Sequence, residues 1–154
     1  MRAAERFFID TNVLLYSVDP ADAAKQRAAR QWLKVLWENG AGCLSWQVLN
    51  EFYVNAVRKV KTPSPKARRL VEALTLWQPV ETSLGLIERG WYWMDEAQLS
   101  YWDSLIVAAS ERAGCVWLLS EDFQAGRKLG DVTVVNPFRS HPASFHWETL
   151  RPLQ

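Results

Sequence analysis

The stretch RFFIDTN, residues 6–12, joins a short apolar run to an acid and two further polar residues. Residues 6–9 have the length and the aromatic and β-branched residues of a buried strand. Asp10 follows directly, where the chain leaves that strand. We therefore expect a buried strand that delivers a carboxylate to one edge of a sheet.

Three further runs, at residues 42–45, 116–119 and 132–135, have the same character. Apolar residues at helical spacing predict helices over residues 21–38, 49–60, 65–77, 83–94 and 101–113, with AsnGly at 39–40 and the prolines at 63 and 65 as stop signals. Strands that alternate with helices favour an α/β sandwich around a mostly parallel sheet, because parallel neighbours need crossover connections.

The nine tryptophans are the most unusual feature of the composition. Five fall on predicted core stripes: Trp32, Trp37, Trp77, Trp91 and Trp102. The periodicity leaves Trp46, Trp93, Trp117 and Trp147 unassigned, and for these four stacking on nucleic-acid bases is the alternative to packing.

The bulk properties exclude little. Lys plus Arg total 18 and Asp plus Glu total 17, so the net charge of +1 gives no overall signal for nucleic acid or membrane. The sequence has no apolar stretch of the roughly 20 residues that cross a bilayer, and we expect a cytoplasmic protein with no membrane partner. Cys43 and Cys115 are expected as buried thiols, and His141 and His146 as surface residues.

Four acids occupy positions that suit a ligand site at the carboxyl edge of a parallel sheet. Asp10 directly follows one predicted strand, and Asp122 comes shortly after another. Glu51 lies early in a helix and off its apolar stripe, and Asp103 begins the last long helix. Each has an ordinary alternative: helix capping for Asp10, Asp122 and Asp103, and a solvated surface charge for Glu51.

As a set, the four acids predict a metal site. Clustered carboxylates repel one another and lose solvation, so such a cleft is tolerable mainly when cations neutralise it. Hard oxygen ligands favour Mg²⁺ or Mn²⁺, and no nearby His and Cys set suggests zinc.

Several segments resemble the PIN-domain family, and in particular VapC-type toxins of bacterial toxin–antitoxin pairs. These are FFIDTNVLLYSVD at 7–19, SWQVLNEFYVNAVRK at 45–59, YWDSLIVAAS at 101–110 and LLSEDFQAGRKLGDVTVVNPF at 118–138. The resemblance implies a three-layer PIN-like α/β sandwich with four to five strands. It implies a domain over residues 1–138, with 139–154 as a C-terminal tail of the same domain.

The resemblance also assigns roles. Asp10, Glu51, Asp103 and Asp122 match the family's catalytic, metal-binding acids, and Thr11, Asn12 and Ser120 match its supporting polar positions. At SerGluAsp the family spacing selects Asp122, which leaves Glu121 facing solvent. Asn136 either orders the edge of the site or forms a turn before Pro137.

The implied activity is Mg²⁺-dependent endoribonuclease chemistry, in which metal-activated water leaves a 3′-hydroxyl and a 5′-phosphate. The implied partners are RNA, a small cognate antitoxin and a second copy of the chain. Candidate RNA-binding cations are Arg58, Lys59, Lys61, Lys66, Arg68 and Arg69. Alternatives are a solitary RNA-processing nuclease or a protein that acts chiefly through antitoxin binding. An aspartate-nucleophile phosphatase is disfavoured, because Asn12 stands where that class has a second Asp.

Overall fold

One five-stranded sheet runs through the protein in the order β2-β1-β3-β5-β4 in the computed structural model, which describes residues 5–147. The strands are β1 (Phe7–Ile9), β2 (Gly42–Cys43), β3 (Trp117–Leu119), β4 (Lys128–Leu129) and β5 (Val132–Val135). All neighbouring pairs are parallel except β4 with β5. The expected mostly parallel sheet is confirmed.

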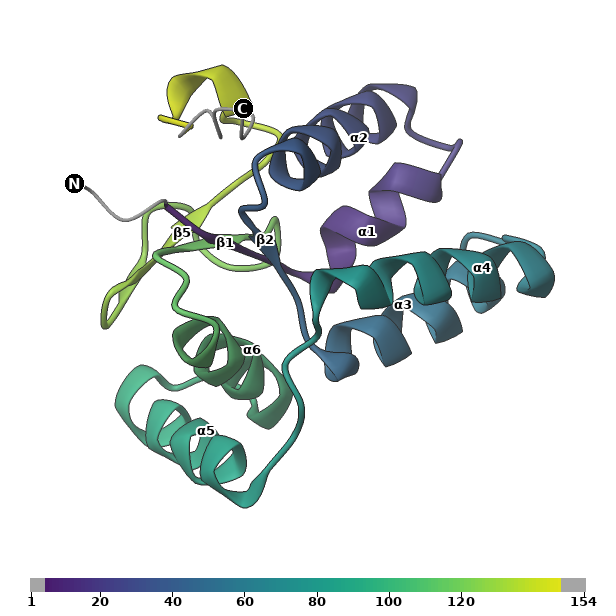
Figure 1. Ribbon diagram of the computed structural model, residues 1–154. Helices are drawn as coiled ribbons and strands as arrows, with labels where there is room; N and C mark the ends of the chain where they lie inside the picture. Colours follow the sequence, from purple (N-terminus) through teal and green to yellow (C-terminus); the bar gives the residue numbers. More distant parts are fainter. Residues whose placement is uncertain (1–4, 148–154) are drawn as a thin grey trace, which may run out of the picture.

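Helices surround the sheet in two groups (Figure 1). They are α1 (Thr11–Val18), α2 (Ala23–Glu38), α3 (Trp46–Arg58), α4 (Ser64–Leu74), α5 (Leu84–Ala97) and α6 (Tyr101–Arg112), with short 3-10 turns η1 (Thr75–Trp77) and η2 (Pro142–Ser144). Helix α1 packs against both α2 and α3, and α3 packs against α4, whereas α5 packs on α6, which contacts β3 and β5. The three-layer α/β arrangement follows from these contacts. None of the helices described is long and apolar enough to cross a membrane.

The sequence patterns missed two elements, α1 and β4. Helix α1 begins immediately after Asp10, which caps it by accepting a hydrogen bond from the Thr11 amide. Its eight residues are too few to show a clear helical period. Strand β4 has only two residues and exists through its antiparallel pairing with β5 across the turn at Gly130, whose φ is 63°.

The predicted core is correct on the sheet and wrong for several tryptophans. All residues of β1 are buried, as are Trp32 and both free cysteines. Trp37, Trp91 and Trp102, which the stripes placed inside, are 54%, 51% and 60% exposed. Trp93 is buried instead of Trp91. Periodicity identifies an apolar face, but each helix covers the core with only part of it.

The segment after β5 packs back onto the amino end of the sheet. The rings of Phe145 and Trp147 lie 5.1 and 5.4 Å from that of Phe7, measured between centroids. Phe145 also contacts Trp32 and Trp117 at 5.6 and 5.4 Å. Residues 139–147 therefore belong to the folded unit, whereas the rest of the predicted tail, 148–154, lies outside the described residues. His141 and His146 are exposed, as expected.

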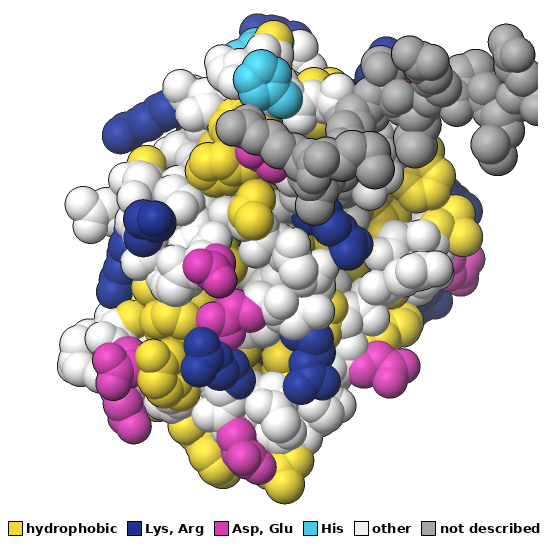
Figure 2. All heavy atoms as spheres, turned by 60° about the vertical axis from the view of Figure 1, so that its left-hand side comes forward, with side chains coloured by type: hydrophobic (Ala, Val, Ile, Leu, Met, Phe, Trp, Pro, Cys, Tyr) yellow, Lys and Arg dark blue, Asp and Glu magenta, His cyan; other side chains and the backbone are white. Residues whose placement is uncertain are grey.

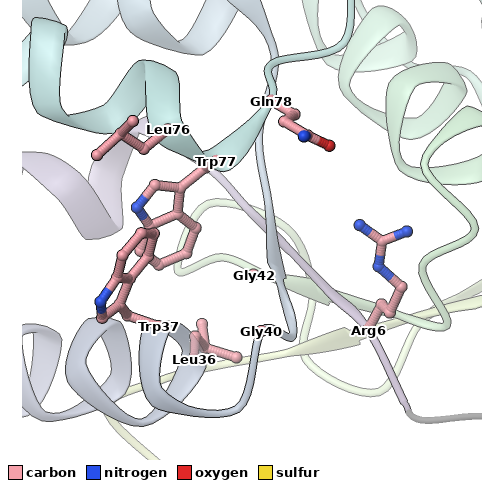
Figure 3. A pocket seen from close by; sticks show the side chains of 8 residues that line it. All are labelled: Arg6, Leu36, Trp37, Gly40, Gly42, Leu76, Trp77 and Gln78. Atoms are coloured by element: carbon pink, nitrogen blue, oxygen red, sulfur yellow. The ribbon is translucent and has the colours of Figure 1, made fainter.

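The lack of a side chain at Gly42 allows the aromatic pair Trp37–Trp77 to pack over β2. These two rings lie 5.6 Å apart, beside a small pocket that Gly42 also lines (Figure 3). A Cβ atom at residue 42 would lie 1.9 Å from ring atom Cζ3 of Trp77. The indole therefore occupies the space that any side chain here would need.

We predict that Gly42→Ala lowers the free energy of unfolding by about 1–3 kcal/mol, the usual cost of overpacking. Chemical denaturation measures it. Trp77→Ala in the same chain should remove the clash, so the double variant should lose less stability than the two single losses combined. Gly85→Ala is the matched control, because its Cβ would meet no ring, only the flexible end of Arg112 at 3.2 Å and the Ser83 hydroxyl at 3.9 Å. Additive losses for residues 42 and 77 would contradict this account.

Candidate active site

The site begins where two adjacent parallel strands end together. Ile9 of β1 pairs with Leu119 of β3, so the next residues, Asp10 and Ser120, emerge at the same level of the sheet. The Asp10 amide donates to the Leu119 carbonyl at 3.1 Å, and the Ser120 hydroxyl donates to Oδ2 of Asp10 at 2.7 Å. Only 6% of Asp10 is exposed. Strand register thus delivers a nearly buried carboxylate with a hydroxyl donor already in contact.

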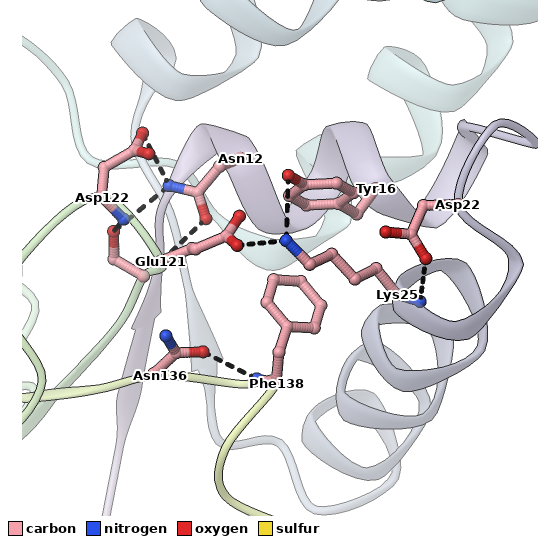
Figure 4. A network of polar contacts seen from close by, with 9 residues as sticks. Asn12, Tyr16, Asp22, Lys25, Glu121, Asp122, Asn136 and Phe138 are labelled. Atoms are coloured by element: carbon pink, nitrogen blue, oxygen red, sulfur yellow. Dashed lines mark hydrogen bonds and ion pairs between the residues drawn. The ribbon is translucent and has the colours of Figure 1, made fainter.

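Asn12 joins Asp10 to Asp122. Its side-chain Nδ2 lies 3.1 Å from Oδ2 of Asp10, 3.1 Å from Oδ2 of Asp122 and 3.2 Å from the Ser120 hydroxyl. Its Oδ1 accepts from the Glu121 amide at 3.1 Å, and these contacts around Asp122 are drawn in Figure 4. Asn12 therefore holds the turn after β3 against the start of α1. The residues directly after Asp122, 123–127, form turns and not a helix, so the capping interpretation of that residue is wrong.

Glu51 reaches the same place from α3. The Thr11 hydroxyl donates to Oε2 of Glu51 at 2.7 Å, and Gln47 donates from Nε2 to Oε1 at 2.8 Å. Glu51 is half-buried, so the interpretation of a solvated surface charge is wrong. Helix α3 starts right after β2, with Ser45 as its N-cap, which places Glu51 in its second turn beside Thr11.

Asp103 approaches from the first turn of α6. Its backbone amide donates to the hydroxyl of the N-cap Ser100 at 3.2 Å, so the expected cap is present. Gln47, which holds Glu51, also donates to the Trp102 carbonyl at 3.1 Å and ties α3 to α6. Partial desolvation raises the pKa of Asp103, and the charges of Asp122 and Glu51 raise it further. Asp103 therefore shares an electrostatic environment with the other acids.

Burial dominates the protonation of Asp10. The pKa of Asp10 is raised from 3.8 to about 6, mainly by loss of solvation and to a smaller extent by the charges of Asp122 and Glu51. Hydrogen bonds from Ser120 and the Thr11 amide oppose it. None of the four acids forms an ion pair with a Lys, Arg or His among residues 5–147. Asp10 is thus a buried acid whose charged form is disfavoured, and no cationic side chain among residues 5–147 pairs with it.

This donor set suits a hard divalent cation. Within the described part of the chain, no three His, Cys, Asp or Glu side chains converge into a ready ligand group. Mg²⁺ does not require one, since it keeps several waters and commonly binds one or two carboxylates together with substrate phosphate. The nearly buried Asp10 with its oxygen-rich surroundings fits that mode of binding.

Glu121 differs from the expectation that it faces solvent. It forms an ion pair with Lys25 of α2, whose ammonium group also lies 3.4 Å from the Tyr16 hydroxyl and over the Phe138 ring (Figure 4). This pair anchors the residue next to Asp122. Asn136 accepts from the Phe138 amide at 2.9 Å, which supports its turn-forming role.

Sequence reasoning missed Gln47 and Lys25 as residues that support the site. Gln47 had a usable signal, because it precedes Glu51 by four residues and hence faces the same side of α3. Lys25 had none, since its contact with Glu121 joins residues 96 positions apart in the sequence.

The candidate RNA-binding cations lie away from the acids. Arg58 ends α3, Lys59 and Lys61 follow in the connection, and Arg68 and Arg69 lie on α4. Together with Lys66, they are all exposed. Arg58 is seven residues beyond Glu51, or about 10 Å along the helix axis. Figure 2 shows Lys and Arg side chains interspersed with Asp and Glu on another face, as the near-neutral net charge predicts.

The fold and the acidic site define an α/β protein of the PIN class. The family model described as "PIN domain" matches residues 7–128, so the chain belongs to the PIN-domain family. No curated protein sequence is significantly similar to it.

Three solved structures with a similar fold are described as a toxin or as a toxin–antitoxin pair. A toxin–antitoxin complex from Klebsiella pneumoniae is 21% identical with a TM-score of 0.65, covering 84% of this chain and 96% of that one. VapBC2 from Rickettsia felis, bound to a promoter DNA fragment, is 14% identical with a TM-score of 0.62, covering 84% and 97%. Mycobacterium tuberculosis VapC20, a toxin that cleaves the sarcin–ricin loop, is 20% identical with a TM-score of 0.58, covering 75% and 89%.

The raised pKa of Asp10 predicts that the free energy of unfolding of the metal-free protein depends on pH. Because the pKa is about 6 in the folded chain and 3.8 in its unfolded reference, the folded state retains a proton that the unfolded state releases. Stability should therefore fall between about pH 4 and pH 6 and then level off, by an amount on the order of 3 kcal/mol.

Comparison with Asp10→Asn isolates this effect, since asparagine does not titrate. Denaturation in EDTA should show the variant gaining stability relative to the wild type as the pH rises through this window. A constant difference from pH 4 to pH 8 would exclude the assigned pKa.

Proposed function

We propose that this protein is a divalent-metal-dependent endoribonuclease that acts as the toxin of a toxin–antitoxin pair in the cytoplasm. The observation that carries the proposal is the network in which Asn12, Ser120 and Thr11 hold Asp10, Asp122 and Glu51 at one sheet edge. Membership of the PIN-domain family supports it.

In this proposal Asp10, Glu51, Asp103 and Asp122 bind Mg²⁺ or Mn²⁺, and Thr11, Asn12 and Ser120 orient their carboxylates. The bound ion supplies a lowered pKa for a coordinated water and neutralises charge on the phosphate. Asp10 is held by donors on both of its oxygens, so it is oriented before a ligand arrives. The raised pKa of Asp10 reflects the unfavourable burial of its charge, and a bound cation would neutralise that charge, which favours cation binding at the site.

The toxin assignment draws on the solved structures with the same fold. One of them is a toxin–antitoxin complex and another is VapBC2. Both support a small protein antitoxin as the partner of this chain. We also propose that the chain forms a homodimer. A neighbouring gene for a small DNA-binding protein would accompany a toxin and would be absent for the alternative, a solitary RNA-processing nuclease.

Asp103→Asn should reduce Mg²⁺-dependent cleavage of RNA by purified protein at least about 100-fold, because loss of one carboxylate removes several kcal/mol of charge stabilisation. Products should carry a 5′-phosphate, which mapping of RNA 5′ ends detects. Asp131→Asn is the control, since Asp131 precedes β5 at the opposite end of the sheet and is exposed. Circular dichroism checks folding. Undiminished cleavage by Asp103→Asn would remove that residue from the proposed mechanism.

The cations on α3 and α4 are proposed to bind the RNA backbone. Reversing the charge at Arg68 and Arg69 should weaken RNA binding and flatten the dependence of log K on log salt by about one to two units. Titrations at several salt concentrations measure this slope. Arg27→Glu, an exposed change on α2, should leave the slope of the wild type nearly unaltered. If the wild type, the Arg68 and Arg69 charge-reversal variant and Arg27→Glu all show the same salt dependence, RNA does not bind at these cations of α4.

A further inference from the structure

An open groove of about 510 Å³ adjoins the acidic site and is flanked by two tryptophans, Trp46 and Trp102. Glu51, one of the four proposed metal-binding acids, lines it directly, and Trp102 immediately precedes Asp103 in α6. A molecule in this groove would therefore lie next to any phosphodiester bound at the carboxylates.

The core does not account for these two side chains. Trp46 and Trp102 are 39% and 60% exposed, whereas Trp32 and Trp93 are buried. Exposing a large aromatic surface forgoes the stabilisation that its burial would provide. Trp37 and Trp91 are exposed as well, but neither lines this groove. Proximity to the acids thus distinguishes Trp46 and Trp102 from the other exposed tryptophans.

The backbone holds both tryptophans in place. Trp46 is the first residue of α3, and its amide donates to the Val80 carbonyl at 3.1 Å. Gln47 donates to the Trp102 carbonyl at 3.1 Å and to Glu51 at 2.8 Å. The same amide side chain therefore couples the position of the groove to that of the acid.

The chemistry of the lining matches a flat, neutral ligand with polar edges. Gln47, Asn50 and Asn55 contribute amide side chains to the lining, which contains no Lys or Arg. A phosphate would find no cation there and would meet the Glu51 carboxylate. A nucleobase has a π-face for tryptophan and edge groups for amides. Arg58 lies one turn beyond Val54 on the same face of α3, where the RNA backbone could continue.

We propose that this groove binds an unpaired nucleobase of the RNA, stacked on Trp46 or Trp102, next to the cleaved phosphodiester. The inference rests on the proposed ribonuclease function and adds to it a requirement for single-stranded RNA at the cleavage site. The two tryptophans act as binding residues for the substrate.

Equilibrium binding tests this without relying on cleavage. The probes are fluorescein-labelled hexa-adenylate and a hexamer of abasic ribose phosphates, measured by anisotropy, with every protein in the Asp10→Asn background to suppress hydrolysis. At least one of the variants Trp46→Leu and Trp102→Leu should weaken hexa-adenylate binding about 5- to 100-fold, the range found when a stacking side chain is removed. Trp46→Phe and Trp102→Phe should retain most of the affinity, because phenylalanine keeps a π-face.

Two controls separate stacking from general damage. Trp91→Leu removes a tryptophan outside the groove whose exposure, 51%, lies between those of Trp46 and Trp102, and this variant should bind hexa-adenylate like the parent protein. The abasic hexamer should bind all variants equally, since it offers no base.

Equal losses for both hexamers, or no loss for either leucine variant, would overturn the nucleobase proposal alone. So would variants that keep RNA binding but lose a co-purified small protein partner, since the groove would then dock protein. Failure of the parent protein to bind any RNA, together with absence of RNA cleavage by the wild type, would overturn the proposed function as well.

Discussion

The hydrogen bond from the Ser120 hydroxyl to the Asp10 carboxylate is the contact on which the site depends. It is 2.7 Å long, and it exists because β1 and β3 pair in parallel with Ile9 opposite Leu119. A buried carboxylate without donors would cost several kcal/mol more than one that is hydrogen-bonded. Register, burial and hydrogen bonding therefore place one acid firmly, and the remaining acids are arranged around it.

Short polar side chains connect the region around Asp10 to the other acids by hydrogen bonds. Asn12 connects Asp10 to Asp122, and Thr11 connects the start of α1 to Glu51. Thr11 and Asn12 both belong to the AspThrAsn segment at residues 10–12. This one segment therefore orients Glu51 of α3 and Asp122, which follows β3. The arrangement concentrates negative charge, which disfavours the metal-free folded state and favours binding of a cation.

Much of the fold followed from pattern alone, and the failures have physical causes. Four strands and five helices lie where apolar runs and helical periods predicted them. The positions of Trp37, Trp91 and Trp102 were wrong, because a helical period identifies an apolar face without showing how much of it a neighbour covers. Lys25 could not be linked to Glu121 from the sequence, since nothing local joins residues on α2 and the turn after β3.

By itself, the sequence determined the alternation of strands and helices, because that depends on local residue type and spacing. It also singled out Asp10, Glu51, Asp103 and Asp122 as candidate acids, through their placement near strand ends and helix starts and through the family resemblance. The resemblance assigned Thr11, Asn12 and Ser120 to supporting polar positions, but the tertiary structure decided which distant acid each one contacts. Thr11 donates to Glu51, Asn12 to Asp122 and Ser120 to Asp10, and only strand pairing and helix packing bring these pairs within 3.1 Å. The tertiary structure also decided that Trp46 and Trp102 face a groove beside Glu51 rather than the core, since exposure depends on which neighbouring elements cover each helix.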